Sequence, residues 1–380
     1  MRVLFSSTPA YGHVFPMVPL ARACLEAGHD VLWATGGQAC ELVQAAGIEA
    51  VAAGHSSDGM ERIASQVRRA GAEVLPADRA RFTYPRLFGE GLTPAMVADL
   101  LPLARSFRPD VLVHEHGELG APLVGAVLDV PSVTHSFGGA IPAEFVADAS
   151  GRLGPLWTEH GRDVAPYAGC FTSTYLDICP PSVQSVSMAH LPSVQPMRPV
   201  SWTGRGSDWV APPGDRPLVY VTLGTVRHDV NVLRAVVAGL TDLPVRVLVT
   251  VGPDGDPAAL GRQPEHVTVE RFVPQTQVLP HCAVVVSHGG SGTFLGTLAL
   301  GLPQLCVPQA ADQFRNAAGG VASGAALALP PGQATPEAIA ESVGALLRED
   351  RYRMAARRVA AEIAGLPSPA EVVPVLAALT

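Results

Sequence analysis

The feature that most constrains the fold is an alternation of short apolar runs with helical segments. In the first half of the chain, the runs at 2–7, 30–35 and 109–115 are typical of buried strands. Helices are expected over residues 16–28 and 39–47, each of which ends at a glycine. Strands that alternate with helices in this way pair in parallel, so a doubly wound parallel sheet is predicted.

The alternation stops at residues 201–216 and then begins again. That stretch, SWTGRGSDWVAPPGDR, is rich in Gly and Pro, and such a composition is typical of a linker. We therefore predict two Rossmann-like α/β domains, residues 1–200 and 217–365. The strands of the second domain are expected at residues 217–224, 245–252, 266–272, 282–288 and 303–308.

Two other segments depart from the alternation. Residues 55–100 are rich in polar residues, Gly and Pro, and are predicted to form loops and short helices, where substrate specificity often resides. Residues 366–380 are expected to form a final helix. The sequence SPAE, with Ser368 at the N-cap and Glu371 at the third helical position, predicts a capping box there.

The composition indicates a globular protein with a sizeable core. Of the 380 residues, 48% are apolar and 16% are charged. No uninterrupted apolar run reaches the roughly 18 residues that suggest a membrane span, so none is predicted. The N-terminus is expected to be the first strand and not a signal peptide. The six cysteines show no CxxC spacing, and we predict reduced core residues of a cytoplasmic protein.

The charged residues limit the possible partners and chemistry. The formal net charge is −8 and no basic block is present, which argues against a nucleic-acid partner. All 26 basic residues are arginines, which excludes a P-loop lysine and a Schiff base. A phosphate group would therefore be held by backbone N–H groups, hydroxyls, His or Arg. No His/Cys cluster has zinc spacing, and no metal site is predicted.

The sequence VVVSHGGSGTFLGTLALG (284–301) predicts an anion site where a buried strand becomes a helix. Gly289 and Gly290 allow a ligand to approach the backbone. The first turn of the following helix offers free N–H groups and the positive end of the helix dipole. The hydroxyls of Ser291 and Thr293 and the ring of His288 can add donors. The spacing differs from the GxGxxG fingerprint, so a dinucleotide site is disfavoured.

His13 is a second candidate for chemistry. It lies in the turn after the first predicted strand and just before the helix that contains Pro16. Ligands bind at the carboxyl ends of parallel strands, and a helix N-terminus favours the neutral imidazole that a general base requires. A single histidine is by itself more often a packing or capping residue.

Residues 271–317 resemble the nucleotide-sugar signature of GT-B glycosyltransferases. The resemblance is closest to the branch that glycosylates macrolides, enediynes and other antibiotic aglycones in actinomycetes. It extends more weakly over nearly the whole chain, including GH (12–13), CPPS (179–182) and LGT (223–225). It implies two Rossmann-like domains that face a central cleft, with the last helix crossing back to the first domain.

The resemblance also implies a donor site. In such enzymes the base lies on the segment that matches Phe272 and Val273, beside Gln275, and the diphosphate rests on the turn that begins at His288. Asp312 and Gln313 match the pair that hydrogen-bonds the donor sugar, and for Asp312 this role is favoured over that of a surface-loop residue. The full set of implied donor-binding residues is Thr225, Phe272, Val273, Gln275, His288, Gly290, Ser291, Gly292, Thr293, Asp312 and Gln313, with Asn316 as a weaker candidate.

In similar enzymes the residue that matches His13 deprotonates the acceptor hydroxyl, and an acidic residue orients it. Glu115 occupies the matching place, with Glu118, His114 and His116 as close neighbours; a surface carboxylate is the alternative. The reaction implied is metal-independent transfer, with inversion, of a sugar from a TDP- or UDP-sugar to a hydroxyl of a lipophilic aglycone. No cofactor is implied, because the nucleotide sugar is a co-substrate. Acceptor contacts are expected from aromatic residues that could equally be core: Phe82, Phe88, Phe137 and Trp157.

Three other functions fit parts of the sequence. An NDP-sugar epimerase can share the fold, but it needs no hydrophobic acceptor site and no residue matching His13. A non-catalytic auxiliary relative is expected to have lost His13, His288 or Asp312, and all are present. A nicotinamide oxidoreductase lacks its fingerprint here. A homodimer is possible and is left open.

Overall fold

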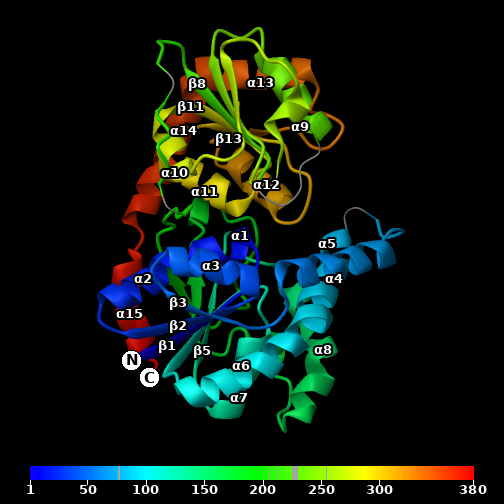
Figure 1. The fold of residues 1–380 in the computed structure, drawn as a ribbon, viewed down its shortest axis with the longest axis vertical. Coiled ribbons are helices and arrows are strands. Elements are labelled where there is room, and N and C mark those ends of the chain that lie inside the picture. Colours follow the sequence, from blue (N-terminus) through cyan, green and yellow to red (C-terminus); the bar gives the residue numbers. More distant parts are fainter. Residues whose placement is uncertain (76–77, 205, 212, 225–229, 254) are drawn as a thin grey trace. The chain divides into compact units, whose positions relative to one another are not determined.

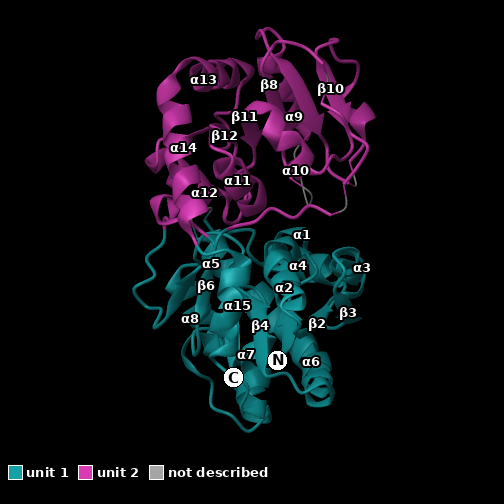
Figure 2. Cartoon of the chain, turned by 90° about the vertical axis from the view of Figure 1, so that its left-hand side faces the viewer, with its two compact units in different colours: residues 1–178, 186–198, 367–380 teal, residues 179–185, 199–366 magenta. Residues whose placement is uncertain are grey.

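The computed structural model describes residues 1–75, 78–204, 206–211, 213–224, 230–253 and 255–380. The chain divides into two compact units (Figure 2). Unit 1 contains Met1–Ile178, Val186–Arg198 and Pro367–Thr380. Unit 2 contains Cys179–Ser185 and Pro199–Leu366. The predicted linker at 201–216 lies within unit 2, and the chain passes between the units at more than one place.

Unit 1 is built on a parallel sheet of seven strands in the order β3-β2-β1-β4-β5-β6-β7 (Figure 1). The predicted strands at 2–7, 30–35 and 109–115 are confirmed as β1, β2 and β4. Residues of β4 are buried throughout, as expected for a strand covered on both faces. The strands are β1 (Arg2–Ser6), β2 (Asp30–Thr35), β3 (Glu49–Ala52), β4 (Val111–Glu115), β5 (Ser132–His135), β6 (Tyr175–Asp177) and β7 (Val194–Pro196).

Helices cover both faces of this sheet. The first strand is followed by a run of short helical segments. Pro16 and Pro19 each lie in the first turn of a segment, where a proline costs no intrahelical N–H bond. The helical segments are α1 (Tyr11–Val14), η1 (Phe15–Met17), α2 (Val18–Glu26), α3 (Gly37–Ala45), α4 (Ser57–Ala70), α5 (Arg79–Tyr84), η2 (Pro85–Leu92), α6 (Thr93–Phe107), α7 (Gly120–Leu128), α8 (Ala143–Glu159), η3 (Pro166–Gly169) and α15 (Pro369–Ala377).

The prediction of loops and short helices over 55–100 was right only in part, because the segment is mostly helical and α4 is longer than expected. The segment contains α4, α5, η2 and the start of α6. Ser56 caps α4 by accepting a hydrogen bond from the Gly59 N–H at 3.2 Å. Ala64 is buried against Leu87 and Leu92, so tertiary packing stabilises a helix whose sequence appears largely polar.

Unit 2 is built on a second parallel sheet, of six strands, in the order β10-β9-β8-β11-β12-β13. All five strands predicted for this domain are confirmed. They are β8 (Leu218–Thr222), β9 (Arg246–Thr250), β10 (Val267–Glu270), β11 (Cys282–Ser287) and β12 (Gln304–Cys306), followed by β13 (Ala326–Ala328). The helical segments are η4 (Pro181–Val183), α9 (Val230–Leu240), η5 (Pro257–Leu260), α10 (Gln275–Val278), η6 (Leu279–His281), α11 (Ser291–Ala299), α12 (Gln313–Ala322), α13 (Pro336–Arg348) and α14 (Asp350–Gly365).

Each sheet has one place where the strand order reverses. In unit 1 the reversal lies between β1 and β4, and in unit 2 it lies between β8 and β11. The connections that leave neighbouring strands at such a point run to opposite faces of the sheet. A crevice therefore opens outside the carboxyl ends of those strands, and it is the usual ligand site of open α/β sheets.

The last helix belongs to unit 1. Ser368 and Glu371 form the predicted capping box at the start of α15. Val372 and Leu376 of α15 are fully buried, and α15 packs against α2. The Arg198 N–H also donates to the Pro367 carbonyl at 2.7 Å, which ties the end of the chain to the last segment before unit 2.

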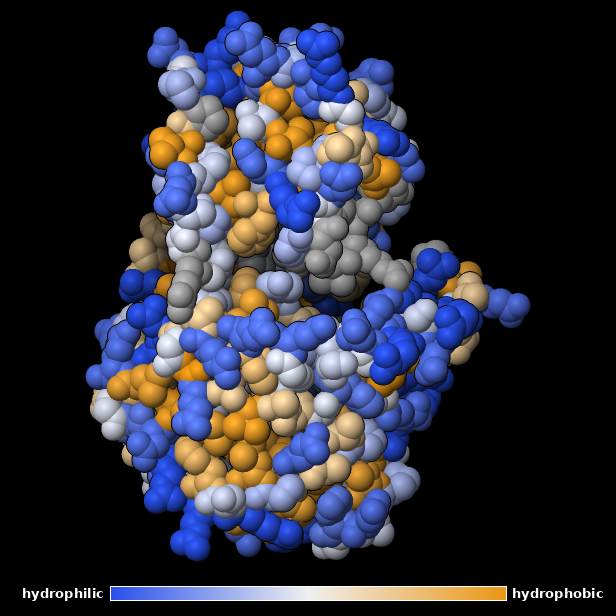
Figure 3. All heavy atoms as spheres, in the orientation of Figure 1, coloured by the Kyte–Doolittle hydropathy of each residue, from blue (hydrophilic) through white to orange (hydrophobic). Residues whose placement is uncertain are grey.

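Two features bear on the composition-based predictions. All six cysteines are buried and free, as predicted for reduced core residues. Two helical stretches, Arg79–Phe107 and Asp350–Ala377, are long and apolar enough to cross a membrane by length and composition alone. The second contains α14 and α15, which belong to different units. On the face drawn in Figure 3, hydrophilic and apolar residues are mixed. The absence of a membrane span stays a prediction.

Candidate active site

His13 and Glu115 meet at the switch point of the unit 1 sheet. His13 lies in α1, just after β1, and Glu115 is the last residue of β4. The His13 Nδ1 atom is 3.0 Å from Glu115 Oε2, and the two side chains are 16% and 0% exposed. Because Nδ1 faces a carboxylate, it carries the proton of the neutral ring. Nε2 is then the basic atom.

The carboxylate of Glu115 is held by backbone and side-chain donors. Its Oε1 accepts hydrogen bonds from the Thr8 N–H at 3.1 Å and from the Thr8 hydroxyl at 2.9 Å, and Oε2 accepts the Gly117 N–H. Burial acts to raise the pKa of Glu115, but His13 and these hydrogen bonds outweigh it and lower that pKa to about 2. Glu115 is therefore ionised at neutral pH.

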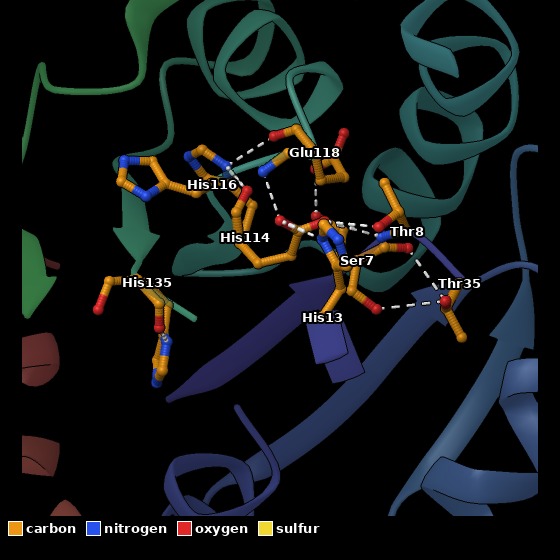
Figure 4. A network of polar contacts seen from close by, with 12 residues as sticks. Ser7, Thr8, His13, Thr35, His114, His116, Glu118 and His135 are labelled. Carbon is orange, nitrogen blue, oxygen red and sulfur yellow. Dashed lines mark hydrogen bonds and ion pairs between the residues drawn. The ribbon is translucent and has the colours of Figure 1, made fainter. Parts of the chain in front are cut away.

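The three neighbouring candidates have other partners. Glu118 accepts the Ser6 hydroxyl at 2.5 Å and the Gly120 N–H at 2.6 Å, which anchors it to the start of α7. His114 Nδ1 lies 2.7 Å from the Glu118 carbonyl, and burial lowers the pKa of His114 to about 4. His116 lies 3.3 Å, through Nδ1, from the hydroxyl of Tyr175. Figure 4 shows Thr8 and His13 close together and His135 apart from them.

Glu118 is expected to make stability depend on pH. Burial raises the pKa of Glu118 from 4.5 to about 7, more than its hydrogen bonds lower it. Between those values the folded state retains a proton that the unfolded state has lost, so stability falls as pH rises. The Glu118→Gln variant should lose this dependence, which is on the order of 2–3 kcal/mol. The free energy of unfolding, measured with urea at pH 5 and at pH 8, gives this difference. If the variant showed the same difference as the wild type, Glu118 would not be its source.

Two of the four predicted acceptor aromatics lie beside His13. The ring centroid of Phe137 is 4.6 Å from that of His13, and that of Phe88 is 5.7 Å away. Phe82 lies elsewhere, under the guanidinium of Arg86 at 3.7 Å. Trp157 is 2% exposed within the core of unit 1. Acceptor contact stays a prediction for all four, and only Phe88 and Phe137 are placed next to His13.

The predicted anion turn lies at the switch point of the unit 2 sheet. His288 follows β11, Gly289 has a φ of 80°, and Gly290 is the N-cap of α11. Among the described residues no side chain caps α11, and its first N–H groups are therefore candidate donors to an anion. The His288 ring fills a slot between two glycines. A Cβ atom at Gly224 or Gly290 would lie 2.8 or 2.3 Å from its Nε2.

The two hydroxyls predicted for the anion site differ in their partners. The Ser291 hydroxyl donates to Asp312 Oδ2 at 2.7 Å, so its proton is already used. The Thr293 hydroxyl accepts a hydrogen bond from Gln275 Nε2 at 2.8 Å and retains its own proton for a ligand. Gln275 therefore orients Thr293.

The pair Asp312 and Gln313 follows the loop after β12. Asp312 is the N-cap residue of α12, and Ala311 before it has a left-handed φ of 53°. The Gln313 Oε1 atom accepts the N–H groups of Gln309 at 2.8 Å and Ala310 at 3.0 Å. Since Oε1 faces two N–H donors, the amide nitrogen of Gln313 is the end left to donate to a ligand.

The remaining donor-site predictions divide by exposure. Phe272 is 42% exposed, so its ring is accessible for stacking with a nucleobase. Val273 is only 3% exposed and packs in an apolar cluster with Leu218 and Tyr220. Gly292 is the second residue of α11. Thr225 lies outside the described residues. Within the described part of the chain, no three His, Cys, Asp or Glu side chains gather as metal ligands.

Sequence reasoning missed Thr8 and Gly224. Thr8 supplies two of the hydrogen bonds to Glu115, and Gly224 leaves room for the His288 ring. Both lie directly after the strands β1 and β8, which flank the switch points. The position of a hydroxyl or a glycine just past such a strand is the signal that could have identified them.

Each unit contains a parallel-sheet, Rossmann-like domain, and this architecture matches that of known GT-B glycosyltransferases. The chain is 34% identical to the L-demethylnoviosyl transferase of Streptomyces niveus, covering 100% of this chain and 98% of the relative. It is 35% identical to the elloramycin glycosyltransferase ElmGT of Streptomyces olivaceus, covering 98% and 96%. The crystal structure of glycosyltransferase VinC in complex with DTDP matches with a TM-score of 0.84 and 26% identity, covering 100% and 99%.

Family models complete the assignment. The N-terminal and C-terminal domain models described as erythromycin biosynthesis protein CIII-like match residues 22–224 and 234–379. The chain belongs to the EryCIII-like family of glycosyltransferases of antibiotic biosynthesis.

Proposed function

We propose that this enzyme transfers a sugar, with inversion and without a metal ion, from a TDP-deoxysugar or a UDP-sugar to a hydroxyl of a lipophilic aglycone. The observation that carries the proposal is the His13–Glu115 pair at the carboxyl ends of β1 and β4. A partly exposed imidazole oriented by a fully buried, ionised carboxylate is suited to take a proton from a bound hydroxyl.

The proposed reaction is a single displacement. His13 Nε2 takes the proton of the acceptor hydroxyl while its oxygen attacks the anomeric carbon of the donor. The bond from that carbon to the diphosphate oxygen breaks, and the nucleoside diphosphate leaves with the electron pair. Glu115 stabilises the imidazolium that forms, in the manner of the acidic member of a catalytic triad. One displacement inverts the anomeric configuration.

The turn that contains Gly290 is proposed to bind the leaving diphosphate. The first N–H groups of α11 and the Thr293 hydroxyl are fixed before the reaction, and charge grows on the diphosphate as its bond to the sugar breaks. Preorganised donors stabilise that charge more in the transition state than in the ground state. The DTDP complex of VinC supports a thymidine nucleotide as the donor.

The acceptor is proposed to lie against Phe88 and Phe137. Their rings lie close to that of His13, so an apolar aglycone packed on them would place a hydroxyl near Nε2. The similarity to the elloramycin glycosyltransferase ElmGT supports an aglycone of this class. The two aromatic rings beside His13 favour transfer over epimerisation, because an epimerase needs no acceptor site. We further propose that the enzyme acts in the cytoplasm.

The proposal is tested by calorimetric titration of the purified protein with TDP, UDP, GDP and NAD in the presence of EDTA. We expect binding of TDP or UDP alone, because the proposed site recognises a pyrimidine nucleotide and uses N–H donors in place of a metal. Binding that appears only when Mg²⁺ is added would overturn metal independence. If none of the four nucleotides bound, the proposed donor site would be wrong, and the proposed transfer reaction with it.

A further inference from the structure

Three side chains of unit 2 form a closed hydrogen-bonded group, here called the Asp312 clamp: Ser291, Asp312 and Asn316. The Ser291 hydroxyl donates to Asp312 Oδ2 at 2.7 Å, and Asn316 Nδ2 donates to the same oxygen at 3.0 Å. Asn316 Nδ2 also lies 3.0 Å from Ser291 Oγ and 2.9 Å from the Gly289 carbonyl. The clamp joins the first turn of α11 to the start of α12.

The amide nitrogen of Asn316 is fully used inside the protein. Its nitrogen faces three oxygen acceptors, and an amide nitrogen has only two protons, which fixes the orientation of the group. Asn316 is also only 5% exposed. Its nitrogen therefore has no donor left for a ligand, and its main role is inferred to run through Asp312.

The clamp acts on one oxygen of Asp312 and leaves the other open. Both donors meet Oδ2, while no hydrogen bond to Oδ1 occurs among the described residues. The carboxylate is thereby held in one rotamer with one oxygen presented for an incoming hydroxyl. A free aspartate would lose rotamer entropy when it bound a sugar, and preorganisation removes that cost.

We propose that Asn316, with Ser291, is a positioning residue that orients Asp312 for the donor sugar. The inference rests on the proposed function, because it concerns the sugar half of the same donor site. Asn316 acts on the sugar through Asp312, whereas the diphosphate is bound by the N–H groups of α11 and by Thr293. Loss of the clamp should therefore weaken recognition of the sugar and spare recognition of the nucleotide.

The test compares TDP with TDP-rhamnose as calorimetric probes. The quantity of interest is the sugar increment, which is the ratio of the Kd for TDP to the Kd for TDP-rhamnose. Asn316→Ala is expected to reduce this increment about tenfold, as loss of a charge-assisted hydrogen bond implies. Its Kd for TDP should stay within about threefold of wild type. Ser291→Ala, a smaller change, should act in the same direction if Asn316→Ala fails to fold.

A double-mutant cycle with Asp312→Ala separates positioning from a general structural role. If Asn316 acts through Asp312, the Asn316→Ala change has no further effect on the sugar increment once Asp312 is alanine. Ser323→Ala at the other end of α12 is the matched control and should leave both constants unchanged. Ser323 contacts Gly320 and Ala325, not the clamp.

Each adverse outcome has a separate meaning. Additive effects of Asn316→Ala and Asp312→Ala, or an equal loss for TDP and TDP-rhamnose in Asn316→Ala, would overturn the positioning role. A wild-type protein that binds TDP-rhamnose no more tightly than TDP would also overturn it, while leaving the nucleotide site intact. A wild-type protein that binds neither TDP nor UDP would instead refute the proposed function.

Discussion

Replacing His13 with alanine is expected to lower kcat about 10³-fold while leaving the Kd for TDP within about twofold of wild type. The substitution removes the proposed base and leaves the carboxylate of Glu115 without its contact to the His13 ring. The nucleotide is proposed to bind in unit 2, whose residues are untouched. Steady-state transfer assays and calorimetry with TDP provide the two numbers.

Two comparisons make the His13 result specific. His29→Ala changes a histidine of the same unit that contacts the N-terminal amine at 3.2 Å, and it should leave kcat unchanged. The pKa of Glu115 is lowered to about 2, so Glu115 stays ionised throughout the neutral pH range. A dependence of kcat on pH in that range therefore cannot come from the titration of Glu115. Equal losses of turnover and TDP affinity in His13→Ala would be inconsistent with a base.

Replacing Gly290 with alanine is expected to weaken TDP binding about 100-fold and to destabilise the protein by about 1–3 kcal/mol. The φ of −64° at Gly290 suits alanine, so backbone strain is not the cause. The new methyl group would lie 2.3 Å from His288 Nε2 and must displace the ring, which the backbone of Gly224 blocks on its other side. Calorimetry with TDP and thermal melting measure the two effects.

Two further variants test that explanation. In a His288→Ala background the ring is absent, so Gly290→Ala should no longer cost stability, although TDP binding should stay weak. Gly292→Ala is the matched control, since a Cβ atom there meets nothing within 4 Å. Gly292→Ala should melt as wild type does. Destabilisation by Gly290→Ala that persists without the ring would show that the steric explanation is wrong.

Patterns local in sequence predicted much of the fold. The runs at 2–7 and 282–288 are β1 and β11, as predicted, because short apolar segments rich in β-branched residues and bounded by turn residues are typical of buried strands. The same reasoning drew attention to His13 and His288, since each lies where such a strand gives way to a helix. The capping box at Ser368 was also predictable, because its hydrogen bonds join residues three apart.

Features that depend on contacts between distant residues were not predictable. Ser6 and Glu118 are 112 residues apart, and Thr8 and Glu115 are 107 apart, so no window of the sequence shows their pairing. The Ser291 hydroxyl was expected to face a phosphate, but the fold brings Asp312 to it instead. Helix α4 was missed because its stability comes from packing on residues of η2 and not from its own composition.

The path of the chain restricts how this enzyme can be recombined with its relatives. A chimera with a single junction at residues 201–216 would take α15 from one parent and α2 from the other, although these two helices pack together in unit 1. Such a hybrid would have a poorly packed contact between α2 and α15, even though its junction lies in the segment predicted as a linker. Hybrids that exchange Pro199–Leu366 as an insert retain α15 with its own partner, and those that also exchange Cys179–Ser185 transfer unit 2 entire.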